Sequence, residues 1–204
     1  MDTNIPWNKG KTVGQKKPFT IQQVRFIEET LRDKGELRDL ALFSCAKDTM
    51  LRASDLLKLK VEDIRDTRGK IKGEFYVRQR KTDKGILVSL SPETKRVLEE
   101  WIRESGKSEG DYLFTGLKGV RRQKPLTYEH YSRLVKYWAR LVHLDPKDYS
   151  THSLRRSKAA YIYKKTQNPE LVRQLLGQKS ITATSHYLNI GQREAIEVAR
   201  EVEF

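Results

Sequence analysis

The sequence lacks the features that mark several large classes of proteins. Its 204 residues include a single cysteine, Cys45, so no disulfide can form within the chain, and the residue fits a reducing compartment. No run of 18 apolar residues is present, which predicts that the chain has no membrane partner. The first 19 residues lack the apolar segment of a secretory signal. We therefore expect a cytoplasmic protein in which Cys45 is a small buried side chain.

The sequence also lacks the signals of common cofactor sites. The string GKT at residues 10–12 resembles part of a nucleotide-binding loop, but that loop needs a glycine where this chain has Ile5. The four histidines and one cysteine do not form a cluster with metal-ligand spacing. We expect neither a cofactor nor a metal ion.

Acidic residues are in the minority. The chain has 27 Asp and Glu against 41 Lys and Arg, a formal net charge of +14, which favours a polyanion such as nucleic acid as partner. The basic residues are unevenly distributed, since residues 117–140 and 152–179 each hold seven against one Glu. Residues 191–204 instead hold four Glu against two Arg. Concentrated positive charge is typical of a surface that follows phosphates.

Periodicity and capping residues predict one mainly helical domain. Thr20 begins a helix with a capping box to Gln23, and its apolar face is Ile21, Val24, Ile27 and Leu31. Two β-forming stretches, EFYVRQR and ILVSL, flank KTDKG and predict a hairpin. Further helices are expected over residues 36–47, from a cap at Ser54, and over 92–104, 127–143, 153–165, 168–177 and a short stretch that includes Tyr187.

The expected fold class is therefore α+β, mainly helical, with a small antiparallel sheet. We divide the chain into a basic flexible arm at residues 1–19, a domain at 20–190 and an amphipathic tail helix at 191–204.

Several polar residues could carry chemistry, and each has an ordinary structural explanation when it is taken alone. Arg52 can pair with Asp55 on the surface. Lys81 can be a charged hairpin residue, His152 a capped histidine and Tyr187 a packed aromatic. Their order along the chain is more informative than any one of them: an Arg, a hairpin Lys, a His-x-x-Arg, a Leu-Gly-x at a helix end, and a Tyr nine residues later.

This ordered set resembles the catalytic domain of tyrosine recombinases, also called phage-type integrases. The resemblance covers about residues 18–190. The stretches that carry it are LRASDLLKLKVEDI (51–64), RQRKTDKGILVSL (78–90), THSLRRSKAAY (151–161) and LLGQKSITATSHYL (175–188).

The resemblance implies a role for each residue of the set. Tyr187 would attack a DNA phosphate and form a 3′-phosphotyrosyl link, which stores the bond energy so that no ATP is needed. Arg52 and Arg155 would stabilise the charge of the transition state. Lys81 would protonate the leaving 5′-oxygen, and His152 would act as base or proton shuttle.

One position departs from the family pattern. Gln178 stands where the family usually has His, or less often Trp; a Gln amide can donate a hydrogen bond to phosphate but cannot titrate. We expect Gln178 to contact the phosphate in a weakened or retuned site, and Asp55 to orient the site from behind. Gly177 would end a helix, and Ile181 would pack.

The resemblance implies double-stranded DNA as partner and a homo-oligomer, a tetramer on DNA, built by exchange of the C-terminal tail. The tail could equally fold back on its own domain. With only about 19 residues before the domain, the chain looks like either a minimal single-domain member or an excised catalytic domain. Two other functions stay open: a DNA-binding regulator that keeps the fold with reduced catalysis, supported by Gln178, and a type IB topoisomerase.

Overall fold

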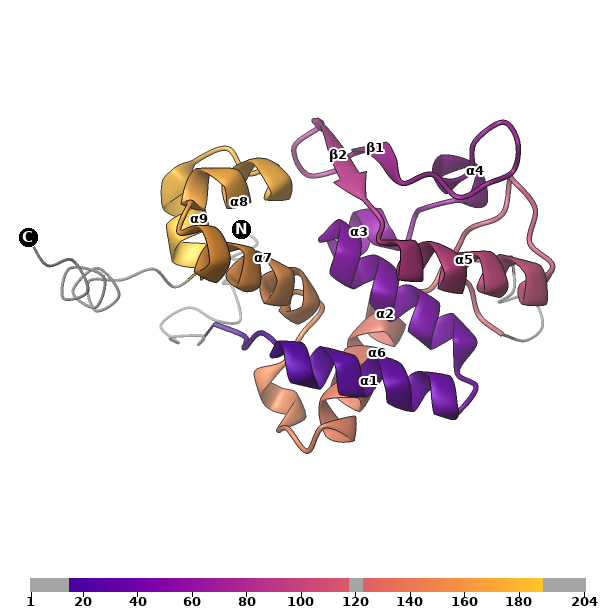
Figure 1. The fold of residues 1–204 in the computed structure, drawn as a ribbon, viewed down its shortest axis with the longest axis horizontal. Coiled ribbons are helices and arrows are strands. Elements are labelled where there is room, and N and C mark those ends of the chain that lie inside the picture. The colour runs from indigo at the N-terminus through magenta and orange to yellow at the C-terminus, as the bar shows by residue number, and fades with distance from the viewer. Residues whose placement is uncertain (1–14, 118–122, 189–204) are drawn as a thin grey trace, which may run out of the picture.

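The computed structural model describes residues 15–117 and 123–188, and this part of the chain is mainly helical with one two-stranded antiparallel sheet, as predicted. The helices are, in chain order, α1 (Ile21–Asp33), α2 (Leu37–Thr49), α3 (Ala53–Leu56), α4 (Val61–Ile64), α5 (Pro92–Ser105), α6 (Tyr128–Leu141), the short 3-10 helix η2 (Pro146–Asp148), α7 (Ser153–Thr166), α8 (Pro169–Leu176) and α9 (Ile181–Leu188). Helices α7, α8 and α9 form a group at one side of Figure 1, and α2 packs against α1, α5 and α7. None of the described helices is long and apolar enough to cross a membrane.

The hairpin lies at the top of Figure 1 and consists of β1 (Glu74–Arg78) and β2 (Gly85–Ser89). Its register pairs Glu74 with Ser89 at the open end and Arg78 with Gly85 next to the loop. Alternate side chains point to the core, as period-two patterning requires, so that Phe75, Ile86 and Val88 are buried. The loop at residues 79–84, which carries Lys81, begins two residues before the expected KTDKG turn, because β1 ends at Arg78, and Gly85 belongs to β2.

Most helix starts agree with the capping signals in the sequence. Thr20 and Gln23 form the expected capping box on α1, and the side chains of Ser91, Thr127 and Asn168 cap α5, α6 and α8. The expected cap at Ser54 is wrong, because α3 begins at Ala53 and Arg52 is its N-cap residue. Ser54 lies inside this helix of four residues, where its hydroxyl donates to the neighbouring Asp55 carboxylate.

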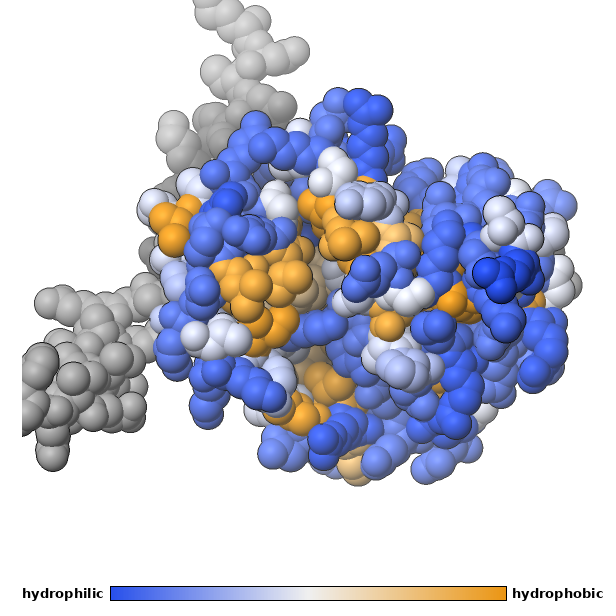
Figure 2. Space-filling model, turned by 45° about the horizontal axis from the view of Figure 1, so that its top comes forward, coloured by the Kyte–Doolittle hydropathy of each residue, from blue (hydrophilic) through white to orange (hydrophobic). Residues whose placement is uncertain are grey.

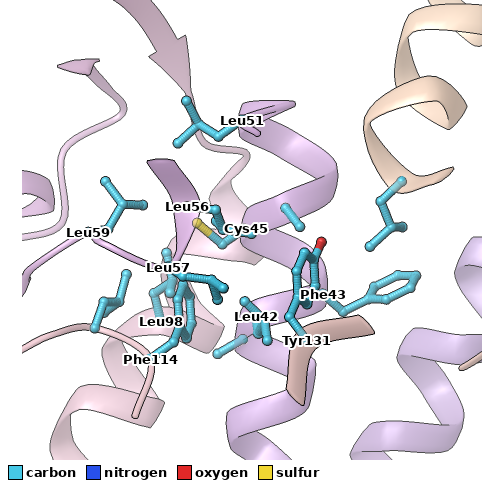
Figure 3. Close-up of a cluster of buried hydrophobic side chains, with 14 of the residues drawn as sticks. Leu42, Phe43, Cys45, Leu51, Leu56, Leu57, Leu59, Leu98, Phe114 and Tyr131 are labelled. Atoms are coloured by element: carbon cyan, nitrogen blue, oxygen red, sulfur yellow. The ribbon is translucent and has the colours of Figure 1, made fainter. Parts of the chain in front are cut away.

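The main core surrounds α2, most of whose side chains are buried. Figure 3 shows Leu42, Phe43 and Cys45 of this helix among side chains from α3, α5 and α6. Cys45 is fully buried, as predicted, and burial raises the pKa of its thiol. A second, smaller cluster lies beneath the α7–α9 group and comprises Met50, Ala159, Val172 and Leu176.

Two apolar residues that we expected to pack are instead exposed. Ile21 is 38% exposed and Ile181 is 45% exposed, because each is the first residue of its helix and no preceding turn covers it. The most exposed large apolar side chain among the described residues, Tyr76 at 76%, is on the outer face of the hairpin. Figure 2 shows hydrophobic patches within a mainly hydrophilic face.

The ends of the chain lie mostly outside the described residues, including the arm before residue 15 and the whole tail at 191–204. The last residues assigned to the arm pack on the domain. Phe19 is buried, stacks on Tyr149 with ring centroids 4.5 Å apart, and donates its backbone N–H to the Ser157 hydroxyl.

Gly177 joins the α7–α9 group to the hairpin. It ends α8 in the left-handed conformation, with φ of +59°, as the sequence predicted. A Cβ at this position would lie 2.6 Å from Ile86 Cγ2 and 2.9 Å from Gln79 Nε2. The hairpin and the end of α8 are therefore as close as a glycine allows.

We expect Gly177→Ala to lower the free energy of unfolding by about 2–4 kcal/mol, because it adds an overpacking cost to left-handed strain. Gly106→Ala is the matched control: Gly106 ends α5 with φ of +64° and has nothing within 4 Å of its would-be Cβ. It should lose only about 1 kcal/mol. Urea unfolding of both variants measures the difference, and equal losses would contradict the close contact.

Candidate active site

A cleft of about 520 Å³ opens between α3, the hairpin loop and the first turns of α6 and α7. Five of its lining residues are basic: Arg52, Lys58, Arg80, Lys81 and His152. None of the described residues that line it is acidic. Uncompensated positive charge at a concave surface raises the local concentration of anions, so the cleft suits a phosphate group.

Arg52 enters this cleft from the N-cap position of α3, and its side chain is half-buried. Its Nη1 atom is buried, and no partner for it exists among the residues that the structure describes. Arg52 does not form the surface ion pair with Asp55 that would give it an ordinary structural role. Asp55 is buried instead and accepts a hydrogen bond of 3.1 Å from the backbone N–H of Arg80. Asp55 thus holds the hairpin loop beside α3 and leaves the Arg52 guanidinium available to a ligand.

Arg155 lies at the start of α7 and is 3% exposed. Its Nη1 donates to the Met50 carbonyl at 2.5 Å, and its Nη2 donates to the Leu176 carbonyl at 2.8 Å. These carbonyls end α2 and α8, whose last carbonyls have no partner within their own helices. Burial lowers the pKa of Arg155, and the nearby hydroxyl of Tyr187 opposes that shift. One guanidinium therefore connects three helices.

His152 is the N-cap residue of α7, one turn before Arg155, and its outer edge is exposed. The pKa of His152 is lowered, first because part of the ring has lost its water and then because cations surround it. These cations are Arg155, Arg52, Arg156 and Lys81. The imidazole is therefore held in its neutral form, which can accept a proton.

Tyr187 is placed on α9, where its ring packs against the second cluster. Its hydroxyl is buried and makes no hydrogen bond of normal geometry with the described residues, although Arg155 is near enough to affect its ionisation. Burial raises the pKa of Tyr187, and the charges of Arg155 and Arg156 oppose that rise. The Arg156 guanidinium lies 5.2 Å from the centre of the tyrosine ring.

The predicted residues are thus divided between two cavities. Arg52, Lys81 and His152 line the 520 Å³ cleft, whereas Tyr187 lines a separate cavity of about 440 Å³ with Arg156 and residues 15–18. The structure brings the tyrosine to Arg155 but leaves it outside the cleft.

Gln178 follows Gly177 and lines neither cavity. Its side-chain oxygen accepts a 2.5 Å hydrogen bond from the Thr184 hydroxyl of α9, and its backbone carbonyl accepts one of 2.8 Å from Arg173. The amide nitrogen can still donate, so Gln178 links α8 to α9 while keeping one donor.

Three residues of the site were missed from the sequence. Arg156, against the tyrosine ring, is the second arginine of HSLRRS, and the doubled arginine was its only signal. Lys58 and Arg80 line the cleft but look like ordinary surface charges in KLK and RQRK. Only the fold shows that they face the same cleft as Arg52.

Comparison with known proteins places this site in a family. Residues 19–194 match the Phage integrase family. Probable integrase/recombinase YoeC of Bacillus subtilis is 25% identical over 173 residues, covering 85% of this chain and 88% of YoeC. A tyrosine recombinase of Pseudothermotoga lettingae is 27% identical over 185 residues, covering 91% of this chain but 59% of that protein. The chain therefore spans only part of several relatives that it matches.

Solved structures agree on the fold. The crystal structure of XerA recombinase superposes with a TM-score of 0.74 at 18% identity, over 94% of this chain and 67% of that one. XerH site-specific recombinase bound to a difH substrate superposes with a TM-score of 0.71 at 21% identity, over 91% of this chain and 53% of that one. The family match covers most of the chain and includes every residue predicted for the site, so the chain belongs to the phage integrase family.

Proposed function

We propose that this protein is a site-specific recombinase that cuts and rejoins double-stranded DNA through a covalent tyrosine link, for integration, excision or inversion. The observation that carries the proposal is the different environment of two arginines. Arg155 is fixed by carbonyls at the end of two helices, and Arg52 presents an unpartnered guanidinium nitrogen at a cleft without acidic lining. The XerH neighbour, bound to its difH substrate, supports DNA as the ligand.

The chemistry proceeds without metal or ATP. The Tyr187 oxygen forms a bond to phosphorus while the bond from phosphorus to the 5′-oxygen breaks. Arg52 and Arg155 stabilise the negative charge that gathers on the non-bridging oxygens. Lys81 gives a proton to the leaving 5′-oxygen, and His152 takes the proton of the tyrosine. A 5′-hydroxyl from another strand then reverses these steps, which rejoins the DNA.

The remaining residues support this centre. Gln178 donates its amide N–H to a non-bridging oxygen, and Asp55 keeps the Lys81 loop next to Arg52 through its bond to the Arg80 backbone. Lys58 and Arg80 contact phosphates that flank the point of cleavage, because they line the same cleft. On DNA the protein assembles as a tetramer in which the tail at 191–204 docks on a neighbouring copy.

Covalent capture tests the reaction. A library of duplexes of random sequence supplies the unknown recognition site. Each duplex carries a nick, so that cleavage releases a short fragment and its loss traps the adduct. We expect wild-type protein to form an adduct that survives detergent, Tyr187→Phe to form none, and Arg52→Ala to be slower by about 10²–10³. Arg103→Ala, an exposed change on α5, should react normally.

Three results would contradict the proposal. An adduct with Tyr187→Phe would remove the tyrosine as nucleophile. Relaxation of supercoiled plasmid that lacks the recovered site would favour a type IB topoisomerase, and sequence-specific binding without any adduct would favour a DNA-binding regulator.

The titration of His152 tests the electrostatics of the cleft. In DNA-free protein its pKa should lie below the usual value of about 6.5, because nearby cations and lost hydration disfavour the imidazolium. Arg52→Ala should raise that pKa, since it removes one of the cations, and bound DNA should raise it further. NMR titration, with His152→Gln to assign the signal, measures this. A midpoint at or above 6.5 in the free protein would contradict the arrangement.

Removal of residues 191–204 tests the assembly. If the tail docks on a neighbouring copy, the truncated protein should still cleave an isolated half-site but should fail to form the slow-migrating complex that wild-type protein forms with two sites. Native gels and mass photometry detect that complex. Normal assembly without the tail would support a tail that folds back on its own domain.

A further inference from the structure

One backbone carbonyl connects two of the proposed catalytic elements. The Leu176 oxygen, at the end of α8, accepts a 2.8 Å hydrogen bond from Arg155 Nη2 and a 3.2 Å hydrogen bond from Gln79 Nε2. Gln79 and Leu176 are fully buried, and Arg155 is 3% exposed. Both lone pairs of the carbonyl are therefore used, and neither donor has water as an alternative partner.

The other atoms of Gln79 organise the loop that carries Lys81. Its side-chain oxygen accepts a 2.8 Å hydrogen bond from the Thr82 hydroxyl. Its backbone N–H donates to the Lys84 carbonyl at 2.9 Å, and its own carbonyl accepts from the Asp83 N–H at 2.8 Å. The loop is thus attached on both sides to one buried residue.

The loop has little else on its outer side to fix it. Lys81, Asp83 and Lys84 are exposed, and the ion pair between Asp83 and Arg78 is on the surface. Such pairs contribute little to stability. The inner contacts are Gln79, the bond from Asp55 to the Arg80 backbone, and the close packing of Gly177 on the Gln79 amide. Of these contacts, only that of Gln79 reaches a hydrogen-bond partner of Arg155, the Leu176 carbonyl.

We propose that Gln79 is a positioning residue, which holds the Lys81 amine in register with the Arg155 guanidinium through the shared Leu176 carbonyl. It touches no reacting atom. Its effect is confined to the step that uses Lys81, the protonation of the leaving 5′-oxygen, so this inference rests on the proposed function. Sequence alone gives no sign of this role, because Gln79 and Leu176 are 97 positions apart.

The test compares two leaving groups on the recovered recognition site. In one duplex the bridging atom is the natural 5′-oxygen, and in the other it is sulfur. When the tyrosine oxygen bonds to phosphorus, the bond from phosphorus to sulfur breaks and sulfur leaves with the electron pair as a thiolate. Because a thiol has a pKa near 8.5, it leaves without a proton donor. A defect in protonation should therefore disappear on the sulfur substrate.

Gln79→Met keeps the length of the side chain and removes its hydrogen bonds. We expect it to cleave the oxygen substrate about 10–100-fold more slowly than wild type and the sulfur substrate at nearly the wild-type rate, as Lys81→Ala should. Thr82→Val, which removes only one bond to Gln79, should show a smaller change of the same kind. Arg52→Ala is the matched control, and should be slow on both substrates because it acts on the non-bridging oxygens.

The ratio of the two rates decides the question. Both rates come from one preparation, so a misfolded fraction lowers them equally and cancels. If Gln79→Met is slowed equally on the oxygen and sulfur substrates, its role is merely structural and the inference is overturned. The proposed function would still stand in that case, provided that the wild-type protein cleaves both substrates. If wild-type protein forms no adduct on either duplex, the proposed function itself fails.

Discussion

The site depends on the burial of one charged side chain, Arg155. A guanidinium cannot lose its water without replacement partners, because an isolated buried charge is strongly unfavourable. The replacement comes from the Met50 and Leu176 carbonyls, at the ends of α2 and α8. Helix ends supply carbonyls that their own helices leave unpaired, so the same two bonds satisfy the arginine and fix where these helices stop relative to α7. Any ligand that reaches Arg155 therefore meets a donor whose position is already set.

The basic cleft lined by Arg52 lowers the stability of the free protein. Arg52, Lys81 and His152 share a surface with no acidic lining residue in the described part of the chain. One nitrogen of Arg52 is buried there without a partner among the described residues, which leaves about 1–3 kcal/mol uncompensated. A protein keeps such a cost where a ligand removes it. A phosphate anion would pair with the guanidinium and relieve the repulsion among the cations, so the same residues that weaken the free protein would strengthen its hold on a bound phosphate.

The features of the fold that the sequence predicts are those held by interactions between residues close together in the chain. Capping at Thr20, Ser91, Thr127 and Asn168 uses atoms within three residues, so the sequence alone predicted these helix starts. The hairpin followed from two short stretches of β-forming residues on either side of KTDKG. The cap at Ser54 was wrong because a helix of four residues has too little pattern to fix its start. The bond from Gln79 to Leu176 and the stacking of Arg156 on Tyr187 could not be predicted, since they arise when segments distant in sequence pack together. The order of motifs gave the predicted site residues, but it could not predict that Tyr187 lines a different cavity from Arg52, Lys81 and His152.

That division bears on how the tyrosine is controlled. Arg155 is bound to carbonyls from two helices and is fully enclosed, so it cannot follow a partner that moves. Tyr187 is half-buried on an eight-residue helix, against a cluster of only four buried residues, and its raised pKa keeps the hydroxyl protonated. If the two are to act on one phosphate, α9 is the element that must shift. Two polar contacts of α9 with the site are the hydrogen bond from the Thr184 hydroxyl to Gln178 and the Arg156 guanidinium over the Tyr187 ring. If Tyr187 is the nucleophile, as proposed, a shift of α9 towards the cleft would have to break these two contacts. Under the proposed function, the resting position of Tyr187 would withhold the reaction until α9 shifts.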